Sequence, residues 1–154
     1  MQRWRLFRRK VAGEAGTASL EFVTAGMILL LPMVYLVLTM SALQAGALAV
    51  EGAARHAARV YVQAPDTREA EAEAERAIRF ALADYGLDPS EASVVISCSP
   101  RPADCLRRRA IVTITVAVSV GLPLVPSGLT IGGPMTVPLR SSATEQVSRF
   151  WGAP

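Results

Sequence analysis

Gly16 and Glu21 are the first residues whose types and spacing suggest chemistry. Glu21 stands at the entrance of residues 22–50, a stretch without any charged side chain, and Gly16 precedes Glu21 by five positions. A glycine leaves an extended backbone unhindered, as a peptidase that cuts beside it requires. A charge at mid-membrane costs about 2.5 to 3.5 kcal/mol, and less near the interface. We therefore expect Glu21 to have an interaction partner that offsets this cost.

The two cysteines, Cys98 and Cys105, enclose a short segment that contains Pro100 and Pro102. Together with the single histidine, His56, they cannot build an ordinary zinc site without carboxylates at convergent positions, and we expect no metal site. A disulfide between them is the simpler interpretation if this part of the chain lies outside the cytoplasm. The alternative is a pair of independent thiols.

No constellation of residues points to catalysis. The possible acids and bases, among them Asp84, Asp88 and His56, have no motif around them, and Ser97-Cys98-Ser99 lacks a histidine-bearing partner segment. We expect no catalytic residues, no cofactor and no enzymatic activity. His56 is expected to be a surface residue of a helix.

The positive charge is confined to the N-terminus. Residues 1–16 carry five basic side chains and one acidic one, a net charge of +4, which leaves −1 of the total of +3 for the remainder. An almost neutral domain lacks the surface that neutralises phosphates, so nucleic-acid binding is not expected. Basic residues directly before an apolar span hold that end in the cytoplasm, so the chain beyond the span should face outward.

The chain therefore divides into three predicted parts: a basic leader at residues 1–16, a long helix at 17–62 and an extracytoplasmic domain at 63–154. The 29 uncharged residues of 22–50 would extend about 44 Å as a helix, and we place the transmembrane part at about 22–42. Pro32 lies inside the span, where membrane helices tolerate proline. The expected location is the cytoplasmic membrane, crossed once.

The predicted domain is small and of α+β class. Pro65, Asp66 and Thr67 form a helix-start signal, and Gly86 followed by Asp88-Pro89 ends that second helix. Its expected buried face consists of Ala70, Ala74, Ala77, Ile78, Ala81, Leu82 and Tyr85. Three antiparallel strands are expected at residues 93–97, 111–120 and 135–141, with Val112, Ile114, Val116, Val118, Val120, Met135, Val137 and Leu139 inward and Pro138 at a sheet edge.

The segment from Gly16 to Glu21-Phe22 resembles the prepilin signature of the type IV filament superfamily, in the form found in Flp and Tad pilins. The Ala- and Arg-rich residues 51–59 and the cysteine-bearing β segment resemble the TadE-like branch. The resemblance implies that prepilin peptidase cuts between Gly16 and Thr17. It also implies that Glu21, the fifth mature residue, pairs with the N-terminal amine of a neighbouring subunit. The implied function is that of a minor pilin or pseudopilin in pilus assembly or adhesion.

The partners implied are prepilin peptidase, other Tad pilus subunits, assembly-platform proteins and membrane lipid. Two alternatives are a signal-anchored binding module that keeps its leader and a type II secretion pseudopilin, whose first mature residue is usually phenylalanine or methionine rather than threonine. A signal peptide cut after Ala49 is a third, but the apolar stretch is far longer than such peptides carry. The sequence does not indicate a position at the tip, in the shaft or at the start of a pilus.

Overall fold

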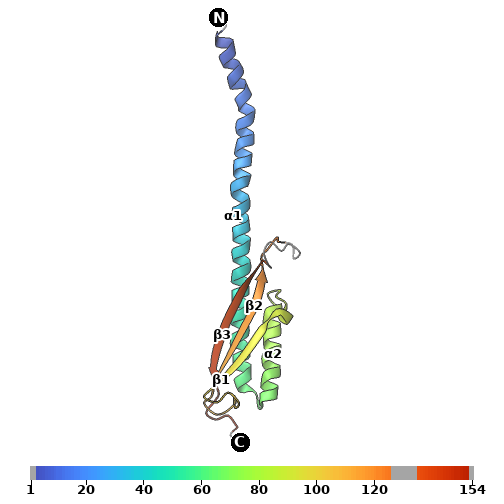
Figure 1. The fold of residues 1–154 in the computed structure, drawn as a ribbon, viewed down its shortest axis with the longest axis vertical. Helices are drawn as coiled ribbons and strands as arrows, with labels where there is room; N and C mark the ends of the chain where they lie inside the picture. The colour runs from blue at the N-terminus through green and yellow to red at the C-terminus, as the bar shows by residue number, and fades with distance from the viewer. Residues whose placement is uncertain (1–2, 126–134, 153–154) are drawn as a thin grey trace. The chain divides into compact units, whose positions relative to one another are not determined.

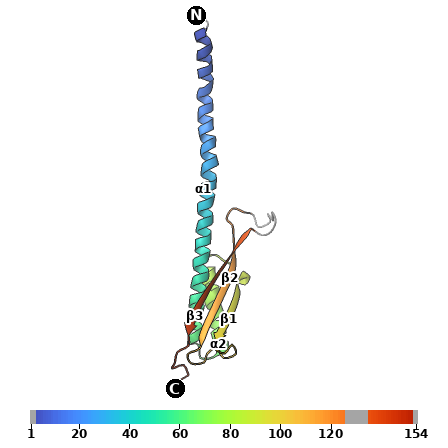
Figure 2. The same cartoon turned by 60° about the vertical axis from the view of Figure 1, so that its left-hand side comes forward.

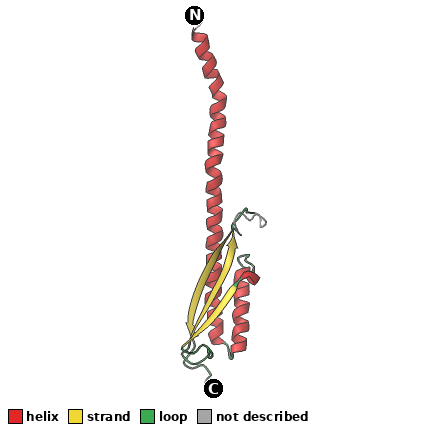
Figure 3. Ribbon diagram, viewed as in Figure 1, coloured by secondary structure: helices red, strands yellow, loops and turns green. Residues whose placement is uncertain are grey.

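Three helices and three strands make up the described part of the chain. The computed structural model describes residues 3–125 and 135–152, with side chains from Ser19 onward. The elements are α1 (Arg3–Gln63), α2 (Thr67–Ala83), the short 3-10 helix η1 (Pro89–Glu91), β1 (Ser93–Ser99), β2 (Ile111–Gly121) and β3 (Thr136–Gln146) (Figures 1 and 3). They confirm the predicted α+β class with a long apolar N-terminal helix. The chain divides into a first unit, Met1–Thr39, and a second unit, Met40–Pro154.

The first unit is the N-terminal part of α1. This helix begins at Arg3, so the residues predicted as a separate leader are helical as well. Leader residues such as Arg, Leu, Glu and Ala favour helix, and an isolated glycine such as Gly13 or Gly16 costs only about 1 kcal/mol. The bond between Gly16 and Thr17 therefore lies within regular helix.

The apolar segment that begins at Ser19 belongs to the one helix, among the described residues, that is long and apolar enough to cross a membrane. The most apolar 18 residues of this segment are not buried by any other part of the described chain. The core helix of a globular protein would be mostly buried. The helix continues through Pro32. The hydroxyls of Thr24 and Thr39 donate to the carbonyls of Leu20 and Tyr35 (2.7 and 2.9 Å), as polar side chains in an apolar helix require.

The second unit is a sheet in the order β1-β2-β3, covered on one face by α2 and by the last turns of α1 (Figures 1 and 2). Both strand pairs are antiparallel, and Val112 of β2 lies between Cys98 of β1 and Glu145 of β3. The side chains of β2 that were predicted to point inward are all buried: Val112, Ile114, Val116, Val118 and Val120. Alternation along β2 therefore identified the core face of the sheet correctly.

The final turns of α1 contribute a large share of this core. Their buried residues are Ala49, Val50, Ala53, Ala54, Ala57, Ala58 and Tyr61. The compact second unit therefore extends back to Met40, because the alanine-rich face of α1 packs against the sheet. Small side chains permit this close approach: a Cβ atom on Gly46 would lie 2.7 Å from Val120 Cγ2.

The second helix begins as predicted, with the Asp66 side chain accepting from the Glu69 amide (2.8 Å). Its predicted buried face is confirmed at Ala70, Ala74, Ala77, Ile78 and Leu82, and Ala81 is half-buried. The prediction that Tyr85 is buried is wrong, since its side chain is 49% exposed. The helix ends at Ala83, and Gly86 turns the chain with a φ of +70°, so Tyr85 no longer follows the helical face.

The third strand is longer than predicted and its buried face is weaker. It extends to Gln146, and Val137 and Leu139 are half-buried, whereas Met135 lies before the strand and is 40% exposed. The inward positions of its second half are the small or polar residues Ser141, Ala143 and Glu145, which do not produce an apolar alternation. Pro138 lies on an edge strand, as predicted.

Candidate functional site

The residues of the predicted processing site follow one another along α1. Gly16 and Thr17 are helical, although their side chains are outside the described part. Thr17 and Glu21 are four residues apart, which places them one above the other on the same helix face. A cut between Gly16 and Thr17 would therefore create a new amino group one helical turn from Glu21.

Glu21 lies on an exposed helix surface that is mostly apolar and otherwise uncharged. Its neighbours Leu20 and Phe22 are 73% and 79% exposed, and no further charged residue occurs before Glu51. No ion pair to Glu21 is found among the side chains described from Ser19 onward. A carboxylate in such surroundings binds an ammonium group well, because each charge is less costly in an apolar medium when it is paired.

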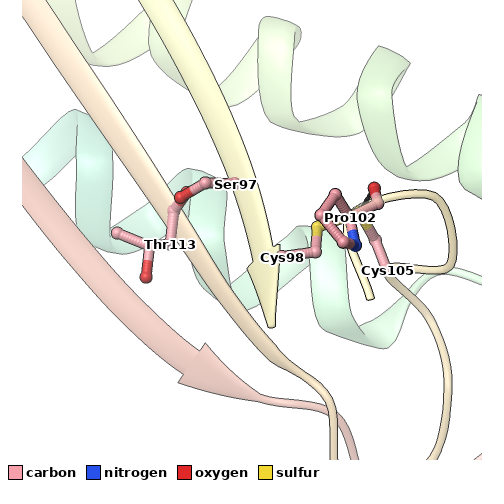
Figure 4. The surroundings of a disulfide bond; sticks show 5 residues. All are labelled: Ser97, Cys98, Pro102, Cys105 and Thr113. Atoms are coloured by element: carbon pink, nitrogen blue, oxygen red, sulfur yellow. Dashed lines mark hydrogen bonds between the residues drawn. A yellow bond between two sulfur atoms is a disulfide. The ribbon is translucent and has the colours of Figure 1, made fainter. Parts of the chain in front are cut away.

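The disulfide between Cys98 and Cys105 is confirmed (Figure 4). Cys98 lies near the end of β1 and is buried, and Cys105 lies in the loop that leads to β2, with 5.2 Å between the two Cα atoms. The same loop inserts Leu106 and Ala110 into the core. The bridge therefore fastens the β1–β2 loop to the sheet, in the manner of small domains that fold in oxidising compartments.

A groove between α1 and β3 was not predicted. It has a volume of about 500 Å³ and is lined by Gly52, Arg55, His56 and Arg59 of α1 and by residues 142–145 of β3. Arg55 also pairs with Glu51, and His56 is exposed, as expected. Arg55 and Arg59 are four residues apart, so the sequence could have predicted that both lie on one face of the helix. Nothing in the sequence indicates that this face lies beside β3.

No protein-family model, no curated protein and no solved structure matches this chain. Its function must therefore be inferred from its own residues and their arrangement.

Proposed function

We propose that this chain is a TadE-like minor pilin, or pseudopilin, of a Flp/Tad pilus, and that it acts in pilus assembly or adhesion. The main support for this proposal is that Gly16 and Glu21 have prepilin spacing and lie at the start of an apolar, unburied helical segment. Chance produces a glycine and a glutamate at this spacing often. Chance seldom places the pair directly after a basic segment and at the entrance of a membrane span.

In this proposal prepilin peptidase removes residues 1–16 and leaves Thr17 as the first mature residue. Its new ammonium group is then available to the Glu21 carboxylate of a neighbouring subunit. Two opposite charges that must both enter lipid are less costly as a pair than alone, so the pairing favours association between helices. Other Tad subunits and the assembly platform are the proposed partners of this step.

The remainder of the chain supports an extracytoplasmic position for the second unit. Five basic residues precede the apolar helix, which favours a cytoplasmic N-terminus, and the Cys98–Cys105 bridge is of the kind formed in an oxidising compartment. The proposed location is thus the cytoplasmic membrane, with the disulfide-bearing unit outside and available to enter a surface pilus.

Replacing Glu21 with Gln tests this function, because Gln keeps the shape of the side chain and removes its charge. The variant should still be inserted and cut, but should no longer recover other pilus subunits in a pull-down or support filaments. Glu51→Gln is the matched control, since Glu51 is also an acid of α1 but pairs with Arg55 outside the predicted span. Equal partner recovery and equal filament counts for Glu21→Gln and wild type, at matched membrane levels, would favour a signal-anchored binding module.

A further inference from the structure

Basic side chains gather in the loop between β1 and β2 and in the segment that follows β3. Residues 100–110 and 147–152 contain five arginines and one acidic residue, Asp104, a net charge of +4. Residues 40–154 contain eleven basic and eleven acidic residues, which leaves −4 for the rest of the second unit. We call the five arginines, all of them exposed, the arginine cluster: Arg101, Arg107, Arg108, Arg109 and Arg149.

Hydrogen bonds join the two segments that supply this cluster. The Arg109 amide donates to the Val147 carbonyl (3.1 Å), and the Val147 amide donates to the Ala110 carbonyl (2.9 Å). Arg108 Nε donates to the Trp151 carbonyl (2.9 Å). Both segments lie at the end of the second unit where α1 stops (Figures 1 and 2). The arginines of the loop and of the C-terminal segment therefore belong to one surface.

The backbone beneath the cluster is fixed. The disulfide holds the loop at Cys105, and Leu106 and Ala110 are each 2% exposed in the core. The C-terminal segment is held by Trp151, whose Nε1 donates to the Ala64 carbonyl (3.0 Å). A ligand that binds here need not order the loop first, so less of its binding free energy is lost.

The arginine cluster has no ion pair among the described side chains. The two ion pairs found there, Arg55 with Glu51 and Arg76 with Glu73, lie on α1 and α2. Like charges held together repel one another, and an anionic ligand relieves this repulsion. A guanidinium binds a carboxylate through two parallel hydrogen bonds, so a ligand with several carboxylates fits this surface.

An exposed aromatic ring lies beside the arginines. Phe150 is 65% exposed, and the guanidinium carbon of Arg149 lies 4.6 Å from the centre of its ring. The negative face of an aromatic ring attracts the polarised C–H groups of a sugar. Phe150 can therefore contact a sugar ring whose carboxylate reaches a neighbouring guanidinium.

We propose that the arginine cluster and Phe150 bind an acidic polysaccharide. Duplex nucleic acid fits less well, because it carries one charge per about 1.7 Å of its length and would extend over the rest of the unit, whose net charge is −4. In an acidic polysaccharide the carboxylates are separated by sugar rings. The inference rests on the extracytoplasmic position in the proposed function, but binding requires neither cleavage nor assembly.

Binding of the full-length chain, in a non-ionic detergent, to immobilised polygalacturonate tests this inference. Every sample, the reference included, carries Gln at the five basic positions of residues 1–16, because these would themselves bind a polyanion. The reference should bind at low ionic strength and be released as salt is added. Methyl-esterified polygalacturonate, which has the same backbone without the charge, should retain little protein, and duplex DNA should bind more weakly.

Arg107→Gln, Arg109→Asn and Arg149→Gln combined should weaken binding about tenfold. Asn suits position 109, where φ is +64°, and Arg108 is kept because it holds Trp151. The matched control removes the same charge elsewhere on the second unit and should change binding less than about twofold. It combines Arg76→Gln, Arg79→Gln and Arg140→Gln.

Equal losses in the two triple variants would overturn the inference, since net charge alone would then control binding. Equal binding of the esterified polymer, tighter binding of duplex DNA or no salt-sensitive binding by the reference would also overturn it. If the triple variant does not fold, Arg107→Gln alone decides, because its side chain makes no hydrogen bond among the described residues. Glu21→Gln should bind as the reference does, so failed assembly and failed binding are distinguishable.

Discussion

Gly46 of α1 faces Val120 of β2 so closely that a Cβ atom on residue 46 would lie 2.7 Å from Val120 Cγ2 and 2.8 Å from Leu139 Cδ1. Replacing Gly46 with Ala should therefore destabilise the second unit. Overpacking costs about 1 to 3 kcal/mol, and the better helix propensity of alanine offsets about 1 kcal/mol of this. The expected net loss is about 1 kcal/mol, measured by denaturant unfolding of the detergent-solubilised chain.

Gly52→Ala is the control for this prediction, because a Cβ placed on Gly52 meets no atom within 4 Å beyond its chain neighbours and the backbone of its own helix. Here the helix propensity acts alone and should stabilise the chain by about 0.5 to 1 kcal/mol. If both variants changed stability in the same direction, the close packing of α1 on the sheet would not be the controlling factor.

The disulfide should stabilise the chain mainly by restricting its unfolded state. Cys98 and Cys105 are separated by seven positions, and closing so short a loop contributes about 2 to 3 kcal/mol. Cys98→Ser combined with Cys105→Ser should lower the free energy of unfolding by that amount. The unfolding midpoint of wild type should fall on reduction, whereas that of the double variant should not respond to reductant.

Asp66 should stabilise α2 as its N-cap. The Asp66 carboxylate accepts a hydrogen bond from the Glu69 amide, which otherwise has no partner within the helix. Asp66→Ala should cost about 1 kcal/mol, and Asp66→Asn, which keeps the acceptor, should cost much less. Circular dichroism during thermal unfolding measures both, and equal losses would contradict a role in capping.

Tyr61 should make stability depend on alkaline pH. Burial of the ring, with the negative charge of Glu71 as a smaller cause, raises the pKa of the Tyr61 phenol above 10. The unfolded chain therefore ionises this group first, so its contribution is complete below about pH 10 and declines as the pH rises toward the folded-state pKa. Tyr61→Phe should lose less stability than wild type between about pH 9 and pH 11, and equal slopes would contradict the assignment.

The elements with a strong local signal were predictable from sequence. Asp66 and Gly86 mark the ends of α2 by capping chemistry, and β2 alternates over its whole length. The disulfide followed from the only two cysteines of the chain and from their short separation. In each case the physical cause acts between residues that are close in sequence.

The remaining features depend on contacts between distant segments. The stripe of alanines at Ala49, Ala53 and Ala57 has the same spacing whether it contacts lipid, another helix or a sheet, so its role in the core could not be inferred. The second half of β3 lacks apolar alternation because its half-buried positions hold Ser141, Ala143 and Glu145. The groove that contains Arg55 and Arg59 requires the pairing of β3 with β2, which sequence does not specify.

If Glu21 becomes the fifth residue of a mature subunit, as proposed, the protein recovered from cells begins at Thr17. Mass spectrometry of the N-terminal peptide, from cells with an active prepilin peptidase, should identify Thr17 as the first residue. A bulky residue in place of Gly16 should leave the basic leader attached, at the same membrane level. Wild-type protein that retains Met1 in such cells would rule out cleavage between Gly16 and Thr17.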